Sequence, residues 1–212
     1  MLSRPGPLPS GSGWSFEVKW DGFRAIVSTE DGLRVRSRRG WSMAELLPEL
    51  GSLPAGLVLD GEVVAWRDGD PYFPDVCARV LNRDASIPIT FVAFDVLRID
   101  GKNMMDASFE ERRATLVRLP LRPPTAAVAE TFADGHALFD SVCKLGLEGV
   151  VAKRLSSRYR ANQRGWVKTK KPELLASRLR ARGDAALAGA SSANPRLAHD
   201  GQNGIRSPQP SE

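Results

Sequence analysis

Lys19 has neighbours that could make its amine a nucleophile. It lies in residues 17–24, Glu-Val-Lys-Trp-Asp-Gly-Phe-Arg, where Glu17 and Lys19 are expected on one face of a strand. Asp21-Gly22 supplies a bend, so Arg24 is expected to return toward the same pocket. Burial and a nearby cation both disfavour the ammonium form of a lysine, and a neutral amine is nucleophilic. Taken alone, this run is equally compatible with a solvated strand that ends in a turn.

Further charged residues lie within apolar segments. Asp60-Gly61-Glu62 is part of the expected strand 57–66, and two buried acids on one face are costly without cations. Glu148 and Lys153 bracket a short apolar strand. Lys168 and Lys170 share a strand face, where a lysine pair is either solvated surface or a phosphate clamp.

In this order, the segments resemble the motifs of covalent nucleotidyltransferases, specifically ATP-dependent DNA ligases, and most closely the bacterial end-joining type. The resemblance runs from about residue 5 to residue 170. It rests on Lys-Trp-Asp-Gly-Phe-Arg, Asp-Gly-Glu, Phe-Asp, Glu-Gly-Val-Val-Ala-Lys and Trp-Val-Lys-x-Lys. It implies an adenylation domain with the nucleotidyltransferase (ATP-grasp-like) ligase fold, which uses ATP as co-substrate together with Mg²⁺ or Mn²⁺.

The resemblance also implies roles for single residues. Lys19 is similar to the catalytic lysine that takes AMP from ATP, and Glu17 to the acid that reads the amino edge of adenine. Phe94, which composition alone would place in the core, matches the aromatic residue that stacks on adenine. Arg24 matches the arginine that holds ribose or phosphate, and Arg38 the one that contacts the substrate 5′-phosphate.

The remaining motif residues are expected around the phosphates. Glu62 resembles the acid near the ribose and the metal, and Glu148 a metal-associated acid. The lysines that match those gripping the α-phosphate and its neighbours are Lys153, Lys168 and Lys170.

The elements that must position these residues mix antiparallel hairpins with helices, which predicts the α+β class. Strands are expected from Trp14 onward and over 25–29, 33–37, 57–66, 89–97, 150–154 and 166–170, with a hairpin at Asp31-Gly32. Helices are expected over 73–81 and 134–145, and after the capping-box spacings at residues 42–45 and 108–111, the latter helix reaching about Leu119.

The chain is expected to form three parts. Residues 1–13 are an extended lead-in rich in proline and glycine, and residues 14–175 the adenylation domain. Residues 176–212 are basic and then low in complexity, which predicts a disordered tail. Most DNA ligases continue into an OB-fold domain at this point, and residues 176–212 lack strand periodicity. Nick sealing is therefore expected to be impaired.

Composition narrows the partners and the compartment. The net charge of +5 and the pI of about 9.6 suit a polyanionic partner. The expected partners are nicked or broken double-stranded DNA, other end-joining or repair proteins, or a separate OB-fold domain. Cys77 and Cys143 do not form a CxxC motif, so neither a zinc site nor a disulfide framework is expected. Without a signal peptide or a long apolar run, the chain is expected in the bacterial cytoplasm, at the nucleoid, and not in a membrane.

Two other interpretations stay open. An RNA ligase or capping-type enzyme would use the same lysine chemistry, but the match at Trp20 and in Phe-Asp-Val-Leu favours a DNA ligase. A degenerate ligase-like module could bind nicked DNA without turnover. The motif residues that argue against such a module are Lys19, Glu62, Glu148, Lys168 and Lys170.

Overall fold

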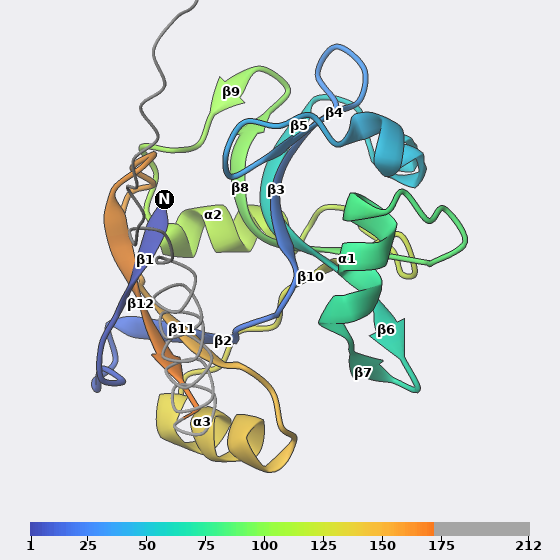
Figure 1. Ribbon diagram of the computed structural model, residues 1–212. Coiled ribbons are helices and arrows are strands. Elements are labelled where there is room, and N and C mark those ends of the chain that lie inside the picture. The colour runs from blue at the N-terminus through green and yellow to red at the C-terminus, as the bar shows by residue number, and fades with distance from the viewer. Residues whose placement is uncertain (172–212) are drawn as a thin grey trace, which may run out of the picture. The chain divides into compact units, whose positions relative to one another are not determined.

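The computed structural model describes residues 1–171, whose longer strands form two sheets (Figure 1). The first sheet has the order β1-β12-β11-β2. Its strands are β1 (Leu2–Pro5), β2 (Trp14–Val18), β11 (Gly149–Arg154) and β12 (Arg164–Lys170). β11 runs antiparallel to both β2 and β12, whereas β1 pairs in parallel with β12. The expected lead-in therefore contains an edge strand of this sheet.

The second sheet has the order β10-β8-β5-β3-β4, with β9 also paired to β8. Its strands are β3 (Phe23–Ser28), β4 (Arg34–Ser37), β5 (Leu57–Val64), β8 (Thr90–Ile99), β9 (Lys102–Asn103) and β10 (Ala126–Val128). β3 and β4 are antiparallel neighbours, which confirms the hairpin predicted at Asp31-Gly32. A separate small hairpin pairs β6 (Trp66–Arg67) with β7 (Asp70–Pro71).

Three α-helices pack against these sheets in residues 1–171: α1 (Phe73–Leu81), α2 (Phe109–Leu116) and α3 (Gly135–Lys144). α2 contacts β8, α3 contacts β11 and β2, and α1 lies beside β5 (Figure 1). The capping box predicted for α2 is present, because Ser108 and Glu111 each accept a hydrogen bond from the other's backbone N–H. Together, the helices and antiparallel strands confirm the α+β class.

The capping box predicted at residues 42–45 is wrong. This segment forms two short 3-10 helices, η1 (Ala44–Leu46) and η2 (Pro48–Ser52), and neither has a side-chain cap. Ser42 instead forms a β-bridge with Arg36 of β4, so its extended backbone continues the hairpin. Residues 172–212, which include the end of the expected domain and the whole expected tail, lie outside the described residues.

β8 carries an irregularity at a motif residue. Asp60 of β5 is opposite Asp95, but the next residue, Gly61, is opposite Ala93. Phe94 is therefore left without a partner on β5. Such a β-bulge bends its strand and redirects a side chain.

Apolar cores lie on both sides of the first sheet. On one side, α3 packs on β2 and β11 through Phe16, Leu138, Val142 and Val150. On the other, side chains from both sheets meet in a shared core, which includes Ile26, Val58, Phe94, Leu97, Val151, Tyr159 and Trp166. The largest core covers the second sheet beneath η1, η2 and α1. No helix within residues 1–171 is long and apolar enough to cross a membrane.

Gly61 provides a test of the packing between β5 and β8. A Cβ atom added there would lie 2.5 Å from the Phe91 ring and 2.6 Å from the Val92 carbonyl oxygen. Because a buried ring and a backbone carbonyl cannot easily move, Gly61→Ala is expected to lower the free energy of unfolding by about 1–3 kcal/mol in urea titrations. Gly13→Ala is the matched control, since an added Cβ there has nothing within 4 Å. Equal stability of the two variants would contradict this close approach.

Candidate active site

A cluster of charged side chains surrounds Lys19, the residue that follows β2. Its backbone N–H donates to the Gly149 carbonyl (2.8 Å), which places Lys19 beside the start of β11. Lys19 Nζ contacts one carboxylate oxygen of the buried Glu148, and Lys170 Nζ contacts the other. Burial raises the pKa of Glu148, but Lys19 and Lys170 outweigh it and hold that pKa below its usual value.

Gly149 makes this arrangement possible. It pairs with Lys170 across β11 and β12, and its φ is 153°. An added Cβ would lie 2.2 Å from the Thr169 carbonyl oxygen. A side chain at this position would force the strands apart, and with them Glu148 and Lys170.

More cations approach the cluster from β12 and from the turn after β4. Burial lowers the pKa of Lys168, and Lys170, Lys19 and the exposed Arg38 lower it further. Arg38, which follows β4 of the other sheet, is thus one of the groups that lower the pKa of Lys168. Their mutual repulsion would be relieved by an anion.

Glu62 supplies a second acid near Lys19. It lies on β5, opposite Arg24 of β3. Burial raises its pKa to about 8, although Lys19 and Arg24 act in the opposite direction. Asp60 and Glu148 add to the increase. A divalent cation would relieve this repulsion, but no group of three or more potential ligand residues for a metal occurs in residues 1–171. Glu148 is one of the groups that raise the pKa of Glu62, and a Mg²⁺ ion bound through one or two carboxylates commonly completes its shell with substrate phosphates and water.

A second cluster contains Glu17, Lys153 and Phe94. Lys153 Nζ lies 2.8 Å from Glu17 Oε2 and donates to the Phe94 carbonyl oxygen at 2.9 Å. Glu17 Oε1 is buried and has no hydrogen-bond partner. A buried acceptor without a partner is costly, so this oxygen fits a ligand that donates a hydrogen bond. The sequence places Lys153 among the phosphate-binding lysines, whereas the structure places it on Glu17.

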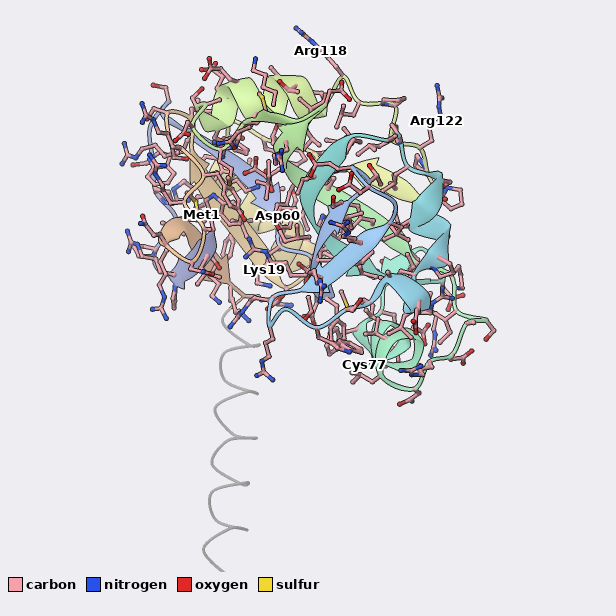
Figure 2. The ribbon with its side chains drawn as sticks, turned by 90° about the horizontal axis from the view of Figure 1, so that it is seen from above. Met1, Lys19, Asp60, Cys77, Arg118 and Arg122 are labelled. Atoms are coloured by element: carbon pink, nitrogen blue, oxygen red, sulfur yellow. The ribbon has the colours of Figure 1, made fainter. Side chains whose placement is uncertain are left out.

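A third cluster holds Arg24. Its guanidinium binds Asp60 through two hydrogen bonds of 2.9 and 2.6 Å and donates to the Met1 carbonyl oxygen at 2.5 Å. Tyr159 donates to the same carboxylate (2.8 Å). Figure 2 shows Met1 and Asp60 in the interior, whereas Arg118 and Arg122 project from the surface. Arg24, expected to face ribose or phosphate, is thus already held by the fully buried Asp60.

Sequence reasoning missed several residues that support these clusters. Asp95, part of the Phe-Asp motif, forms a fully buried pair with Arg112 (2.7 Å). Arg112 lies in α2 and outside the quoted motifs, so nothing in the sequence around it indicates that it pairs with Asp95. Tyr159, likewise, lies in a polar segment without periodicity. Trp166 belongs to a quoted motif, but its place among Lys153, Phe94 and Tyr159 follows only from the fold.

A small buried apolar cluster adjoins residues of both the first and the second cluster. Trp20, which follows Lys19, and Phe94, which contacts Lys153, are both half-buried against Val64, Val92 and Ala129. The site therefore combines an amine, phosphate-compatible cations and two acids with an aromatic ring and an unsatisfied acceptor that both belong to residues in contact with Lys153. These are the groups needed to bind a nucleoside phosphate with an amino-bearing base.

Comparison with known proteins agrees with this chemistry. The family model of the ATP dependent DNA ligase domain matches residues 9–170. The multifunctional non-homologous end joining protein LigD of Mycolicibacterium smegmatis is 36% identical over 166 residues, which cover 74% of this chain and 21% of that protein. The Mycobacterium tuberculosis H37Rv protein of the corresponding name is 37% identical over 80% of this chain and 23% of its own length. The chain thus spans less than a quarter of these relatives.

Solved structures show the same relationship. The structure described as mycobacterial DNA ligase D complexed with ATP and MES has a TM-score of 0.68 and 34% identity, covering 80% of this chain and 58% of that one. The fold is therefore the nucleotidyltransferase-type fold of a DNA ligase domain. The match favours neither an RNA ligase nor a capping enzyme. On the extent of the family match and the identity of these relatives, the chain belongs to the family of ATP-dependent DNA ligase domains.

Proposed function

We propose that this chain is the adenylation core of an ATP-dependent DNA ligase that acts in DNA end joining. Lys19 takes AMP from ATP, AMP passes to a DNA 5′-phosphate, and a 3′-hydroxyl displaces it to seal the strand. The observation that carries the proposal is the position of the Lys19 amine, which lies on buried Glu148 beside Lys170. The mycobacterial relatives named for end joining motivate the choice of pathway.

The covalent step requires a neutral amine. The Lys19 ammonium must first give a proton to water, because an ammonium group has no lone pair, and its ion pair with Glu148 opens as that charge is lost. The neutral Nζ then attacks the α-phosphorus, a nitrogen–phosphorus bond forms, the bond to pyrophosphate breaks, and the attacking amine releases a second proton to water. Incoming phosphates support this opening, since they attract Lys168 and Lys170 and repel the Glu148 carboxylate. Lys168 and Lys170 then offset the charge on the phosphate oxygens.

Glu62 and Glu148 are the proposed ligands of Mg²⁺ or Mn²⁺. When bound with ATP, the metal would stabilise negative charge on the phosphate oxygens. The raised pKa of Glu62 supports this assignment, because a carboxyl group with too little compensating charge gains from a nearby divalent cation.

Glu17 and Phe94 are the proposed adenine-binding residues. Glu17 Oε1 lacks a partner and can accept a hydrogen bond from the exocyclic amino group. Phe94 is half-buried and offers a ring for stacking. Arg24, which Asp60 holds beside Glu62, adds positive charge near the ribose and phosphates. Arg38 is the proposed contact for the DNA 5′-phosphate.

Replacement of Lys19 tests the covalent step. Lys19→Arg keeps the positive charge but removes the nucleophile, because guanidinium stays protonated. Incubation with [α-³²P]ATP and Mg²⁺, followed by a denaturing gel, is expected to show acid-labile label in the unaltered chain and none in Lys19→Arg. Label that persists in Lys19→Arg would refute the assignment. If the unaltered chain binds nicked DNA but takes no label, it is a degenerate binding module.

Replacement of Phe94 tests base stacking. Phe94→Ala is expected to weaken ATP binding by roughly 1–3 kcal/mol, the range measured for stacking of one base on an aromatic residue. Isothermal titration gives this difference directly. Phe139→Ala, which removes a half-buried ring of α3 from the core on the other side of the first sheet, is the control and should leave ATP binding unchanged. Equal affinity for ATP in the unaltered chain and in Phe94→Ala would show that Phe94 packs in the core and does not stack on adenine.

A sealing assay tests how far the chain proceeds through the ligase reaction. A labelled nicked duplex is expected to be sealed faster by the purified 212-residue chain when its 5′-phosphate is already adenylated, because the first two steps are then bypassed. DNA binding should weaken steeply with salt. Equal sealing rates of the plain and the adenylated nick would contradict this expectation.

A further inference from the structure

Lys153 is almost completely enclosed and lies apart from the Lys19–Glu148–Lys170 cluster. Its side chain is 1% exposed. Two hydrogen-bonding contacts engage Nζ, one with Glu17 Oε2 at 2.8 Å and one with the Phe94 carbonyl oxygen at 2.9 Å. The rest of its surroundings is aromatic: the ring centroids of Phe94, Trp166 and Phe109 lie 4.5, 4.6 and 4.9 Å from Nζ. These contacts leave little room for a phosphate group.

The bond to Phe94 compensates for the bulge in β8. Phe94 has no register partner on β5, and β10 pairs with β8 only at residues 91–93. Its carbonyl group therefore lies outside both ladders, and Lys153 supplies the hydrogen-bond donor. A backbone carbonyl left unpaired in a protein interior is unfavourable. Lys153 thus holds the backbone that presents the Phe94 ring.

The contact between Lys153 and Glu17 determines which carboxylate oxygen of Glu17 can accept a hydrogen bond from a ligand. Lys153 occupies Oε2, whereas Oε1 is buried without a partner. Burial raises the pKa of Glu17, and Lys153 is the main group that opposes this effect, with a smaller contribution from Arg113. An ionised carboxylate can only accept hydrogen bonds, but a protonated carboxyl group can also donate one.

We propose that Lys153 is a positioning residue that sets the choice of nucleobase, by keeping Glu17 an acceptor and holding the Phe94 ring beside it. The inference rests on the function proposed above. Adenine carries an amino group where guanine carries a carbonyl oxygen. A carboxylate oxygen at Glu17 therefore attracts the adenine edge and repels the guanine edge, and a site built to pair with one donor rejects an analogue that lacks it.

The alternative role for Lys153, phosphate binding, makes a different prediction. ATP and GTP carry the same triphosphate, so loss of a phosphate contact would weaken both nucleotides equally. Loss of the Glu17 contact would instead leave a buried carboxylate without its main counter-charge, with only the smaller contribution of Arg113 remaining. Glu17 would then take up a proton and could donate to the guanine carbonyl. The affinity for ATP divided by the affinity for GTP therefore distinguishes the two roles. The same quotient also distinguishes a positioning role from a general loss of stability, which would weaken both nucleotides.

The test compares Lys153→Met and Lys153→Gln with the unaltered 212-residue chain. Labelling rates with [α-³²P]ATP and [α-³²P]GTP, and equilibrium affinities for both nucleotides, give the preference. We expect the ATP preference to fall at least ~10-fold in both variants, the scale of one hydrogen bond to a charged group. Lys153→Arg, which keeps the charge, should retain part of the preference. Lys153→Gln keeps a neutral donor for the Phe94 carbonyl and decides the matter if Lys153→Met does not fold.

Two controls have defined outcomes. Lys144→Met removes an exposed lysine at the end of α3 and should leave both the preference and the melting temperature unchanged. Arg79→Met removes a buried cation that binds Glu49 and backbone carbonyls away from the site, so it should lower the melting temperature without changing the preference. An unchanged preference in the folded Lys153 variants would overturn the inference. A lack of Lys19 labelling in the unaltered chain would instead refute the proposed function.

Discussion

Buried carboxylates, each facing a cation from another element, are the constraint on which the arrangement of this domain depends. Glu148 joins the ends of β2 and β12 through Lys19 and Lys170, and Glu17 joins β2 to β11 through Lys153. In the second sheet, Asp60 of β5 binds Arg24 of β3, and Asp95 of β8 binds Arg112 of α2. Removing one partner of a buried pair is far more costly than losing a surface pair. The correct sheet order is therefore required both for folding and for assembling the site.

Trp166 connects the charged clusters at the junction of the two sheets. Its ring lies 5.2 Å from the Arg24 guanidinium carbon and 4.6 Å from Lys153 Nζ. It also packs edge-on against Phe94 and Tyr159. Arg24, which binds Asp60, and Lys153, which binds Glu17, thus both contact the Trp166 ring. Aromatic faces attract cations, so this ring stabilises both without adding another charge.

The charges around Lys19 and Glu62 are of the kind that ATP and a divalent cation would change. Lys19 is paired with Glu148, while the second acid, Glu62, has a pKa raised to about 8. ATP with a divalent cation would change the ion pair and the pKa of Glu62. The phosphates of ATP would compete with Glu148 for the lysines, and the metal would offset the negative charge of the two acids. In this way the charge needed for catalysis comes partly from the substrate. The protein contributes cations and acids that are held in place before ATP binds.

The sequence determined the features that depend on local patterns. The hairpin at Asp31-Gly32, the capping box at Ser108 and the order of the motifs around Lys19 need only neighbouring residues to be recognised. Even so, the capping-box spacing at Ser42 failed, because a β-bridge to Arg36 competes for that backbone. A local pattern gives no information about such a distant partner.

Only the tertiary structure decided which charge faces which. The family resemblance implies that Lys153 binds phosphate, but the pairing of β11 with β2 brings its amine to the Glu17 carboxylate. The bulge that leaves Phe94 without a partner on β5, and the parallel pairing of β1 with β12, likewise depend on register between distant segments. Spacing along the chain specifies which face of a strand a side chain occupies. It does not specify the neighbouring strand or its register, and these decide where a buried charge finds its counter-charge.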